Sequence, residues 1–143
     1  MTAPENLRIS FEPLNDEPRQ FVIDGLNSHN IAASGATAWY QVRYYLRTPD
    51  GEVLGGLLGE IWARWLHIKI VWVDEIARGQ GHATAMVRDA EAYAAKRGCH
   101  GAHLETFSFQ ARPLYEKLGY TVFGQLDDYP PGHVQYFMKK RFA

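Results

Sequence analysis

The sequence has little of several features that mark large classes of proteins. Its 143 residues include a single cysteine, Cys99, so the chain cannot form an internal disulfide, which suits the cytosol. No apolar run reaches the roughly 18 residues of a membrane-spanning helix. The first ten residues have neither the charged nor the apolar region of a secretory signal. Together these absences predict a cytoplasmic location and no partnership with a membrane.

An excess of either charge is missing as well. The formal net charge is -1 at pH 7, whereas binding to nucleic acid or to an anionic membrane calls for a strong basic excess. We therefore expect no nucleic-acid partner. No internal repeat, linker or low-complexity segment interrupts the chain. Its length suffices for a substantial core, so residues 1–143 are expected to form a single domain.

Apolar patterning predicts alternating strands and helices, and thus a mixed α/β sheet. The stretch 67–73 is nearly all apolar, which predicts a central strand covered on both faces. The sequence PDGE at 49–52 predicts a hairpin turn. Strands are expected at 6–14, 36–48, 53–63, 67–73, 101–107, 120–126 and 134–142, and helices at 17–33, 80–98 and 110–119.

The segment that connects the strand 67–73 to the following helix contains the sequence Arg78-Gly79-Gln80-Gly81. A buried strand, glycines and then a helix without early acidic residues would present free backbone N–H groups and a positive dipole end. Such an arrangement binds phosphate oxygens, although a plain turn is the alternative. The P-loop pattern is absent, and Thr84 stands where a Rossmann fingerprint needs a small residue.

Two motifs, one in this connecting segment and one further along the chain, together resemble those of a known family. Residues 78–83, RGQGHA, resemble the pyrophosphate signature [QR]-x-x-G-x-[GA] of the GNAT N-acetyltransferases, and residues 111–120, ARPLYEKLGY, resemble that family's second signature. One helix and one strand lie between them, as in the family, and the similarity covers about residues 53–141. The resemblance implies a mixed, mostly antiparallel sheet of six to seven strands flanked by three to four helices, with acetyl-CoA as co-substrate.

The resemblance also implies roles for individual residues. GNAT enzymes transfer the acetyl group directly from the thioester to an amine, without an acyl-enzyme. Tyr115 matches a tyrosine near the thioester sulfur that can protonate the departing thiolate, a role that suits a phenol with an ordinary pKa of about 10. The implied cofactor contacts are Val71, Trp72 and Val73 for the pantetheine arm, and Arg78, Gly79, Gln80, Gly81, His82, Ala83 and Thr84 for the pyrophosphate.

One position departs from the family pattern. Many relatives carry an asparagine three residues before the alanine of the second signature, where it contacts the cofactor. Ser108 occupies this position, and its hydroxyl can still form a hydrogen bond. We therefore retain Ser108 as a cofactor-binding candidate.

The sequence does not single out the general base, the group that takes a proton from the acceptor ammonium. Glu105 is the first candidate because its strand precedes the signature helix. Glu60 on the preceding hairpin is second, and Asp74 and Glu75 are third. For each of them a solvated surface carboxylate is the alternative.

Two further groups of residues carry weaker signals. Cys99, His100 and His103 do not form a zinc motif, because the two histidines would face opposite sides of a strand, and we expect no metal. The loop 127–133 carries Asp127 and Asp128 beside Tyr129. It is either a wall that attracts a cationic amine or an ordinary connection.

The sequence predicts an acetyl-CoA-dependent N-acetyltransferase with Tyr115 and Glu105 as catalytic residues. A primary amine of a small molecule is the favoured acceptor. A protein acceptor, through a lysine or an α-amine, is the alternative, followed by a non-catalytic acyl-CoA-binding module. The sequence leaves open whether the protein forms a homodimer.

Overall fold

The computed structural model describes residues 2–143, which fall into two units divided after Ala36. The first unit contains one helix, α1 (Asp16–Ser34), which confirms the helix expected at 17–33. Gly35 ends it in the left-handed region (φ 71°) and donates its N–H to the carbonyl of Ile31 at 2.8 Å. The strand expected at 6–14 is wrong, since these residues form no strand. Apolar and polar residues do alternate in this stretch, but residues 2–36 contain no strand with which it could pair to complete its backbone hydrogen bonds.

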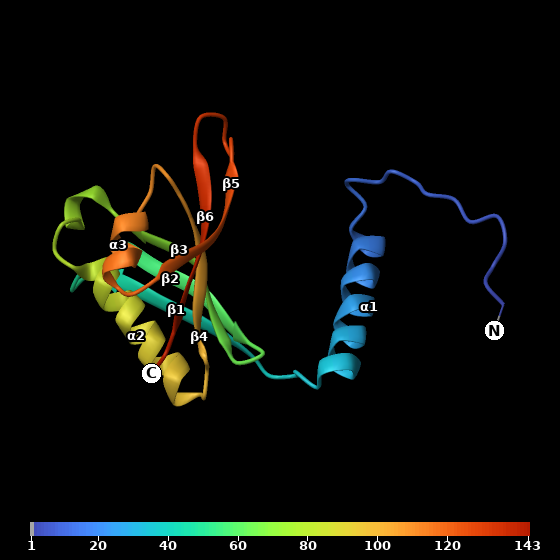
Figure 1. The fold of residues 1–143 in the computed structure, drawn as a ribbon, viewed down its shortest axis with the longest axis horizontal. Helices are drawn as coiled ribbons and strands as arrows, with labels where there is room; N and C mark the ends of the chain where they lie inside the picture. The colour runs from blue at the N-terminus through green and yellow to red at the C-terminus, as the bar shows by residue number, and fades with distance from the viewer. Residues whose placement is uncertain (1) are drawn as a thin grey trace. The chain divides into compact units, whose positions relative to one another are not determined.

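The second unit is built on one six-stranded sheet with the order β1-β2-β3-β4-β6-β5 (Figure 1). All neighbouring strands pair antiparallel except β3 and β4, which pair in parallel. This confirms the expected mostly antiparallel mixed sheet. The strands are β1 (Trp39–Arg47), β2 (Val53–Trp62), β3 (Trp65–Val73), β4 (Gly101–Phe107), β5 (Thr121–Asp127) and β6 (Val134–Arg141).

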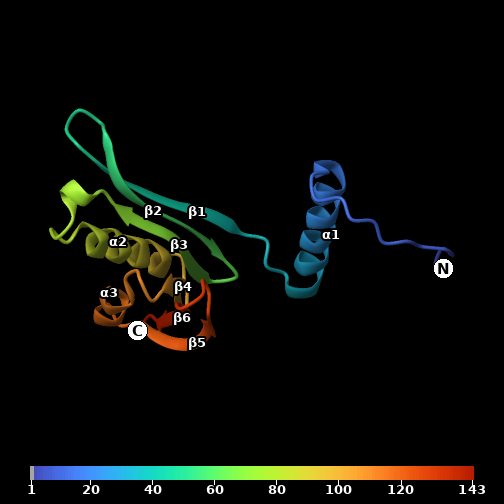
Figure 2. The ribbon, with the colours of Figure 1, turned by 90° about the horizontal axis from the view of Figure 1, so that it is seen from above.

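Two α-helices and a short 3-10 helix complete the second unit. They are η1 (Glu75–Ala77), α2 (His82–Lys96) and α3 (Arg112–Lys117). Figures 1 and 2 show α2 and α3 on the same side of the sheet. The face of α2 predicted from its spacing is the buried one, with Met86, Val87, Ala90 and Ala94 inside and Ala83 half-buried. Among the described residues the unit of the sheet thus contains two α-helices, α1 being in the first unit, which is slightly fewer than the three to four flanking helices expected.

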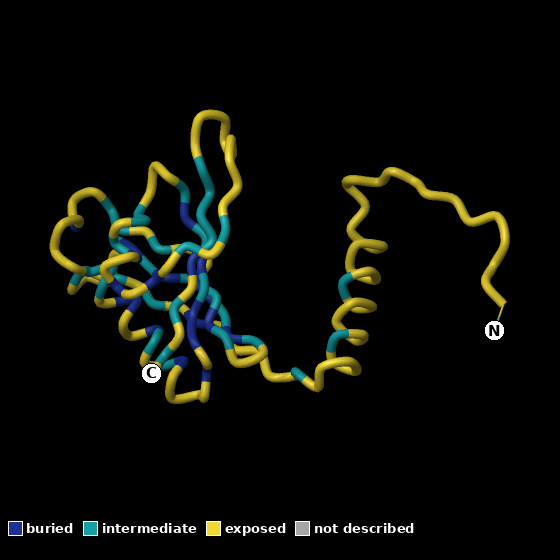
Figure 3. Tube along the Cα trace, viewed as in Figure 1, coloured by how far each residue is buried: buried dark blue, intermediate teal, exposed yellow. Residues whose placement is uncertain are grey.

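The core lies between this helical layer and the sheet, where the buried residues gather in Figure 3. Its largest fully buried side chains are Tyr120, Leu57, Leu66, Ile68, Leu104, Met138 and Val87. A polar contact ties the layers together: the Tyr120 hydroxyl donates to Glu91 of α2 at 2.7 Å, and Lys140 of β6 donates to the same carboxylate at 2.9 Å. Burial and this carboxylate together hold the pKa of Tyr120 well above its ordinary value.

The parallel strands β3 and β4 separate part-way along their length. They pair only from Trp65 to Ile68 on β3, whereas β3 continues to Val73. A register shift on the β2 side falls at Lys69, between the partners of Leu58 and Gly59, and such bulges bend a strand and raise its twist. The expectation that 67–73 is covered on both faces is therefore wrong, because Ile70 and Trp72 are half exposed beyond the separation.

One further property concerns the described helices and their relation to a membrane. None of those in residues 2–143 combines the length and the apolar character that crossing a membrane requires.

Candidate active site

The loop between η1 and α2 has the backbone geometry of an anion site. Gly79 (φ 77°) and Gly81 (φ 80°) adopt the left-handed conformation that glycine accepts without strain. A Cβ added at either position would meet no atom within 4 Å, so neighbouring protein atoms do not fill the space beside them. The first helical hydrogen bond of α2 runs from Ala85 N–H to the Gly81 carbonyl, and the first turn has no acidic residue. The preceding N–H groups and the dipole thus favour a negative ligand.

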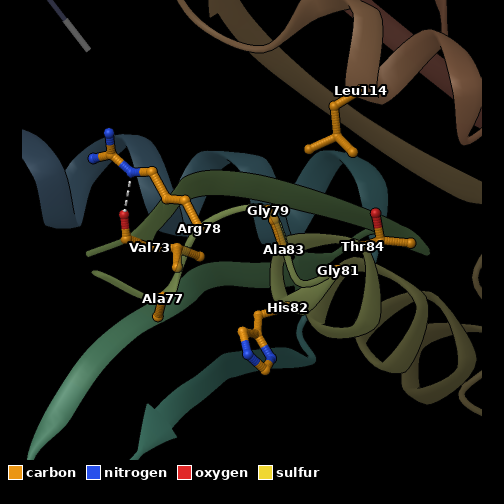
Figure 4. Close-up of a pocket in the computed structure, with 9 residues that line it drawn as sticks. All are labelled: Val73, Ala77, Arg78, Gly79, Gly81, His82, Ala83, Thr84 and Leu114. Atoms are coloured by element: carbon orange, nitrogen blue, oxygen red, sulfur yellow. Dashed lines mark hydrogen bonds between the residues drawn. The ribbon is translucent and has the colours of Figure 1, made fainter. Parts of the chain in front are cut away.

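A hollow of about 260 Å³ opens at this loop (Figure 4). Arg78 borders it but turns its side chain back, where Nε donates to the carbonyl of Val73 at 2.8 Å. Gln80 does not line the hollow, and its amide oxygen lies 3.3 Å from Nε2 of His82. The residues that line it are Val73, Ala77, Arg78, Gly79, Gly81, His82, Ala83, Thr84 and Leu114.

A second hollow, of about 270 Å³, lies where β3 and β4 separate. It brings together Tyr115 of α3 and Glu105 of β4, which are ten residues apart in the chain. Val71 and Trp72 of β3 also border it, so this strand passes from one hollow to the other. The full lining is Ile68, Lys69, Ile70, Val71, Trp72, Glu105, Thr106, Gln110, Ala111 and Tyr115.

Tyr115 is largely enclosed at the wall of this second hollow. Its residue is 7% exposed, and its ring meets that of Tyr120 edge-on with centroids 5.9 Å apart. Burial raises the pKa of Tyr115 to about 12. The phenol is therefore protonated at neutral pH and can donate a proton to a stronger base in the hollow.

The carboxylates considered as the general base have different partners. Glu60 is engaged twice, since Oε1 lies 2.8 Å from Nζ of Lys69 and Oε2 accepts from the Trp39 indole at 3.0 Å. Asp74 accepts from the N–H of Ile76 at the start of η1, and Glu75 begins that helix. Among these candidates, Glu105 alone borders the hollow that contains Tyr115.

Ser108 takes part in the local structure beyond β4. Its hydroxyl oxygen accepts from the N–H of Val134 at 3.0 Å, at the start of β6. Neither hollow includes Ser108 among its lining residues. A hydrogen bond to the backbone explains why a small hydroxyl residue fits here.

The loop after β5 also packs against the end of β4. The Tyr129 ring centroid lies 5.7 Å from that of Phe107, and the Phe109 and His133 rings meet edge-on at 4.9 Å. Asp127 accepts from the Gln125 amide at 2.9 Å. Asp127 and its neighbour Asp128 are exposed, and neither lines the two hollows described above.

A residue that sequence reasoning did not single out lies behind Glu105. The Nε2 atom of His67 is 2.8 Å from Oε2 of Glu105, across the parallel pair β3 and β4. His103 stacks on His67 with ring centroids 4.3 Å apart and planes 13° apart. The three side chains place potential ligand atoms within 4.8 Å of one another. However, stacked rings direct their nitrogens along parallel planes, so the arrangement favours a hydrogen-bonded pair over ligation of one ion.

Comparison with known proteins identifies the family. Residues 10–120 match the model of the acetyltransferase (GNAT) family. The chain belongs to this family. An acetyltransferase of Agrobacterium fabrum is 34% identical to this GNAT chain over 126 residues, which cover 88% of the chain and 92% of the relative. The blasticidin-S acetyltransferase of Streptomyces morookaense is 41% identical over 91 residues, 63% of the chain and 67% of the relative.

The solved structures agree on the architecture. A crystal structure of an acetyltransferase from Bacillus cereus superposes with a TM-score of 0.85 at 28% identity, covering 94% of this GNAT chain and 98% of the other. The chain is accordingly an acyltransferase whose acetyl donor is acetyl-CoA, the donor of GNAT acetyltransferases.

Proposed function

We propose that this GNAT enzyme transfers the acetyl group of acetyl-CoA directly to a primary amine of a small cationic molecule. The observation that carries the proposal is that Tyr115 and Glu105 border one hollow at the separation of β3 and β4. A proton donor and a proton acceptor on one cavity are what an amine acetylation needs. Of the other candidate bases, Glu60 and Asp74 have partners of their own, and neither they nor Glu75 line this hollow.

The donor is proposed to lie along β3 and the start of α2. Its pyrophosphate would take the hollow at 78–84, bound by the free N–H groups of the first turn. The pantetheine arm would follow the backbone of Val71, Trp72 and Val73, which border both hollows in turn. This path leads the thioester toward Tyr115.

The two side chains would then divide the proton transfers. The Glu105 carboxylate removes one proton from the acceptor ammonium, and the free amine attacks the thioester carbonyl carbon. A C–N bond forms and the C–S bond breaks as the tetrahedral intermediate collapses. The phenol of Tyr115 protonates the leaving sulfur and regains a proton from the nitrogen. One proton thus reaches the solvent and one the thiol, which balances the reaction.

The size of the second hollow, the negative group on its wall and the name of one relative all support a small cationic acceptor. The second hollow, at about 270 Å³, is slightly smaller than the roughly 300–1,000 Å³ typical of small-molecule sites, which suits a compact acceptor. Glu105 supplies a negative group on its wall. The relative from Streptomyces morookaense is named for acetylating blasticidin S, a small molecule. These features favour a compact amine over a lysine in a folded protein.

The test is a turnover screen with acetyl-CoA. A panel of small amines that includes blasticidin S is compared with lysine-containing and free-N-terminal peptides, with release of thiol and intact mass as readouts. The Tyr115→Phe variant serves as the control for enzyme-dependent transfer. We expect acetylation of at least one cationic small amine at rates far above peptides. Acetylation of peptides alone would contradict the proposed acceptor class.

A further inference from the structure

The His67–Glu105 pair is an arrangement that the family motifs do not include. The two side chains belong to neighbouring parallel strands, and Nε2 of His67 lies 2.8 Å from Oε2 of Glu105. Both side chains are partly exposed, at 26% for His67 and 32% for Glu105. Glu105 borders the hollow of Tyr115, whereas His67 does not. The histidine therefore lies behind the carboxylate, away from the lining of the cavity.

We propose that His67 is a positioning residue for Glu105 in the acetyl transfer. This inference rests on the proposed function, in which Glu105 accepts the proton of the acceptor ammonium. The hydrogen bond engages one carboxylate oxygen and leaves the other directed to the substrate. Because the carboxylate only accepts, Nε2 of His67 carries the hydrogen of this bond, and the proton that Glu105 takes from the ammonium is released to solvent from its other oxygen. The carboxylate is thereby restored for the next turnover.

The surroundings of His67 hold its ring in place. The imidazole of His103 stacks on it, with ring centroids 4.3 Å apart. On the other side, β2 lies close: a Cβ added at Gly59 would come within 2.5 Å of the His67 carbonyl oxygen, so only glycine allows this approach. A stacked ring on a tightly paired strand loses little entropy when it forms one fixed hydrogen bond.

The charged and titratable groups around the pair lie on β2, β3, β4 and β6, and none of those named here replaces His67 as the partner of Glu105. Glu60, the partner of His67 in the β2–β3 register, is bound to Lys69, which carries the positive charge nearest along β3. Lys139 of β6 is the register partner of His103. Desolvation, and secondarily the neighbouring His67, lower the pKa of His103, so the stacked ring favours the neutral state. A neutral neighbour brings no positive charge of its own to the His67–Glu105 contact.

The first test compares substitutions at His67 on an amine whose acetylation is limited by chemistry. His67→Gln can still donate a hydrogen bond to Glu105, whereas His67→Ala cannot. The matched control is His100→Gln, an exposed histidine just before β4. We expect kcat to fall about 10- to 100-fold in His67→Ala and clearly less in His67→Gln, because general-base catalysis depends on the orientation of the carboxylate. The amine KM should change less than about threefold, and His100→Gln should match wild type.

Chemical rescue separates positioning from packing. Added imidazole, which can supply the same N–H donor, should restore part of kcat in His67→Ala but not in Glu105→Ala. The acidic limb of the pH–kcat profile should also change in His67→Ala. Wild-type kcat in His67→Ala, or a loss that neither imidazole nor glutamine at position 67 restores and that leaves the pH profile unchanged, would overturn the proposal.

A second measurement does not depend on turnover. In an NMR titration of the histidine side chains, the His67 signals should titrate differently in Glu105→Gln and in wild type, while those of His100 coincide. Identical His67 titrations would mean that the two groups are not coupled, and would overturn the inference even in an active enzyme. A wild type that acetylates no amine would instead count against the proposed function.

Discussion

At the residue scale, the proposed chemistry depends on the opposite environments of two side chains. Tyr115 is enclosed, which keeps its phenol protonated, and Glu105 remains partly exposed beside a histidine. An acid and a base bordering one hollow can serve the leaving thiolate and the entering amine, respectively. The second signature places Tyr115 from sequence, because the motif is local. His67 has no local signal, since its contact depends on the register between β3 and β4.

Replacing Tyr115 by phenylalanine tests the acid. We expect kcat to fall roughly 10- to 1000-fold, in or near the range for loss of general-acid catalysis, with little change in acetyl-CoA affinity. The measurements are steady-state kinetics and calorimetric titration of the cofactor. Because the pKa of Tyr115 is about 12, wild-type kcat should show no alkaline fall from this phenol up to about pH 10.

Tyr120→Phe is the matched control. It removes a buried hydroxyl that donates to Glu91, so stability should drop by roughly 1.5–3 kcal/mol while kcat per folded molecule is retained. An unchanged kcat in Tyr115→Phe, with chemistry rate-limiting, would remove Tyr115 from the mechanism.

At the scale of elements, the junctions between strands and helices form the site. The loop 78–84 follows β3 and opens α2, and the separation of β3 from β4 opens the second hollow. The sequence predicted most elements because each carries its own periodicity and end signals, such as Gly98 (φ 78°) after α2. The strand predicted at 6–14 was wrong, because alternating apolar and polar residues suit a strand but do not supply the second strand with which it must pair. The sequence also missed the exposure at Ile70 and Trp72, which follows from strand separation and not from composition.

Substitutions at Gly81 test the anion site with matched size. Asparagine and aspartate both tolerate the left-handed conformation of this residue, and they differ in charge alone. Acetyl-CoA should raise the Tm of wild type by mass action and that of Gly81→Asn by a smaller amount. Gly81→Asp should abolish the shift because its carboxylate repels the pyrophosphate. If folded Gly81→Asp binds acetyl-CoA as tightly as Gly81→Asn, the loop does not bind phosphate.

The loop after β5 gives a prediction about the acceptor. Asp127 and Asp128 are exposed near the end of β4, where a cationic amine would pass. Changing both to asparagine should raise the amine KM and spare kcat, because the charges bind ground and transition states alike. Each charge at contact distance contributes about 1 kcal/mol in water, or roughly fivefold in KM.

Salt provides the check on this electrostatic effect. The difference in KM should shrink as ionic strength rises, since these carboxylates are open to solvent. Asp50→Asn, on the exposed turn between β1 and β2, is the control and should leave KM unchanged. An unchanged KM in the double variant would show that the loop is an ordinary connection.

At the scale of the whole molecule, function follows from how one sheet arranges two sequence signatures. They lie more than 25 residues apart in the chain, yet β3, α2 and α3 bring their residues to neighbouring hollows. Most of the predicted cofactor contacts border these hollows, with Gln80 and Ser108 as the exceptions. Those two were assigned from motif position alone, and the structure shows that their side chains bond to neighbouring protein groups.

The direct transfer of the acetyl group is the central claim, and a single-turnover experiment tests it. Enzyme is mixed with acetyl-CoA labelled in the acetyl carbonyl and with an acceptor from the amine screen, then quenched at successive times. We predict that label moves from acetyl-CoA into the amine product at the rate of thiol release, with none bound covalently to protein. Label that first accumulates on the protein and then moves to the amine would contradict the account.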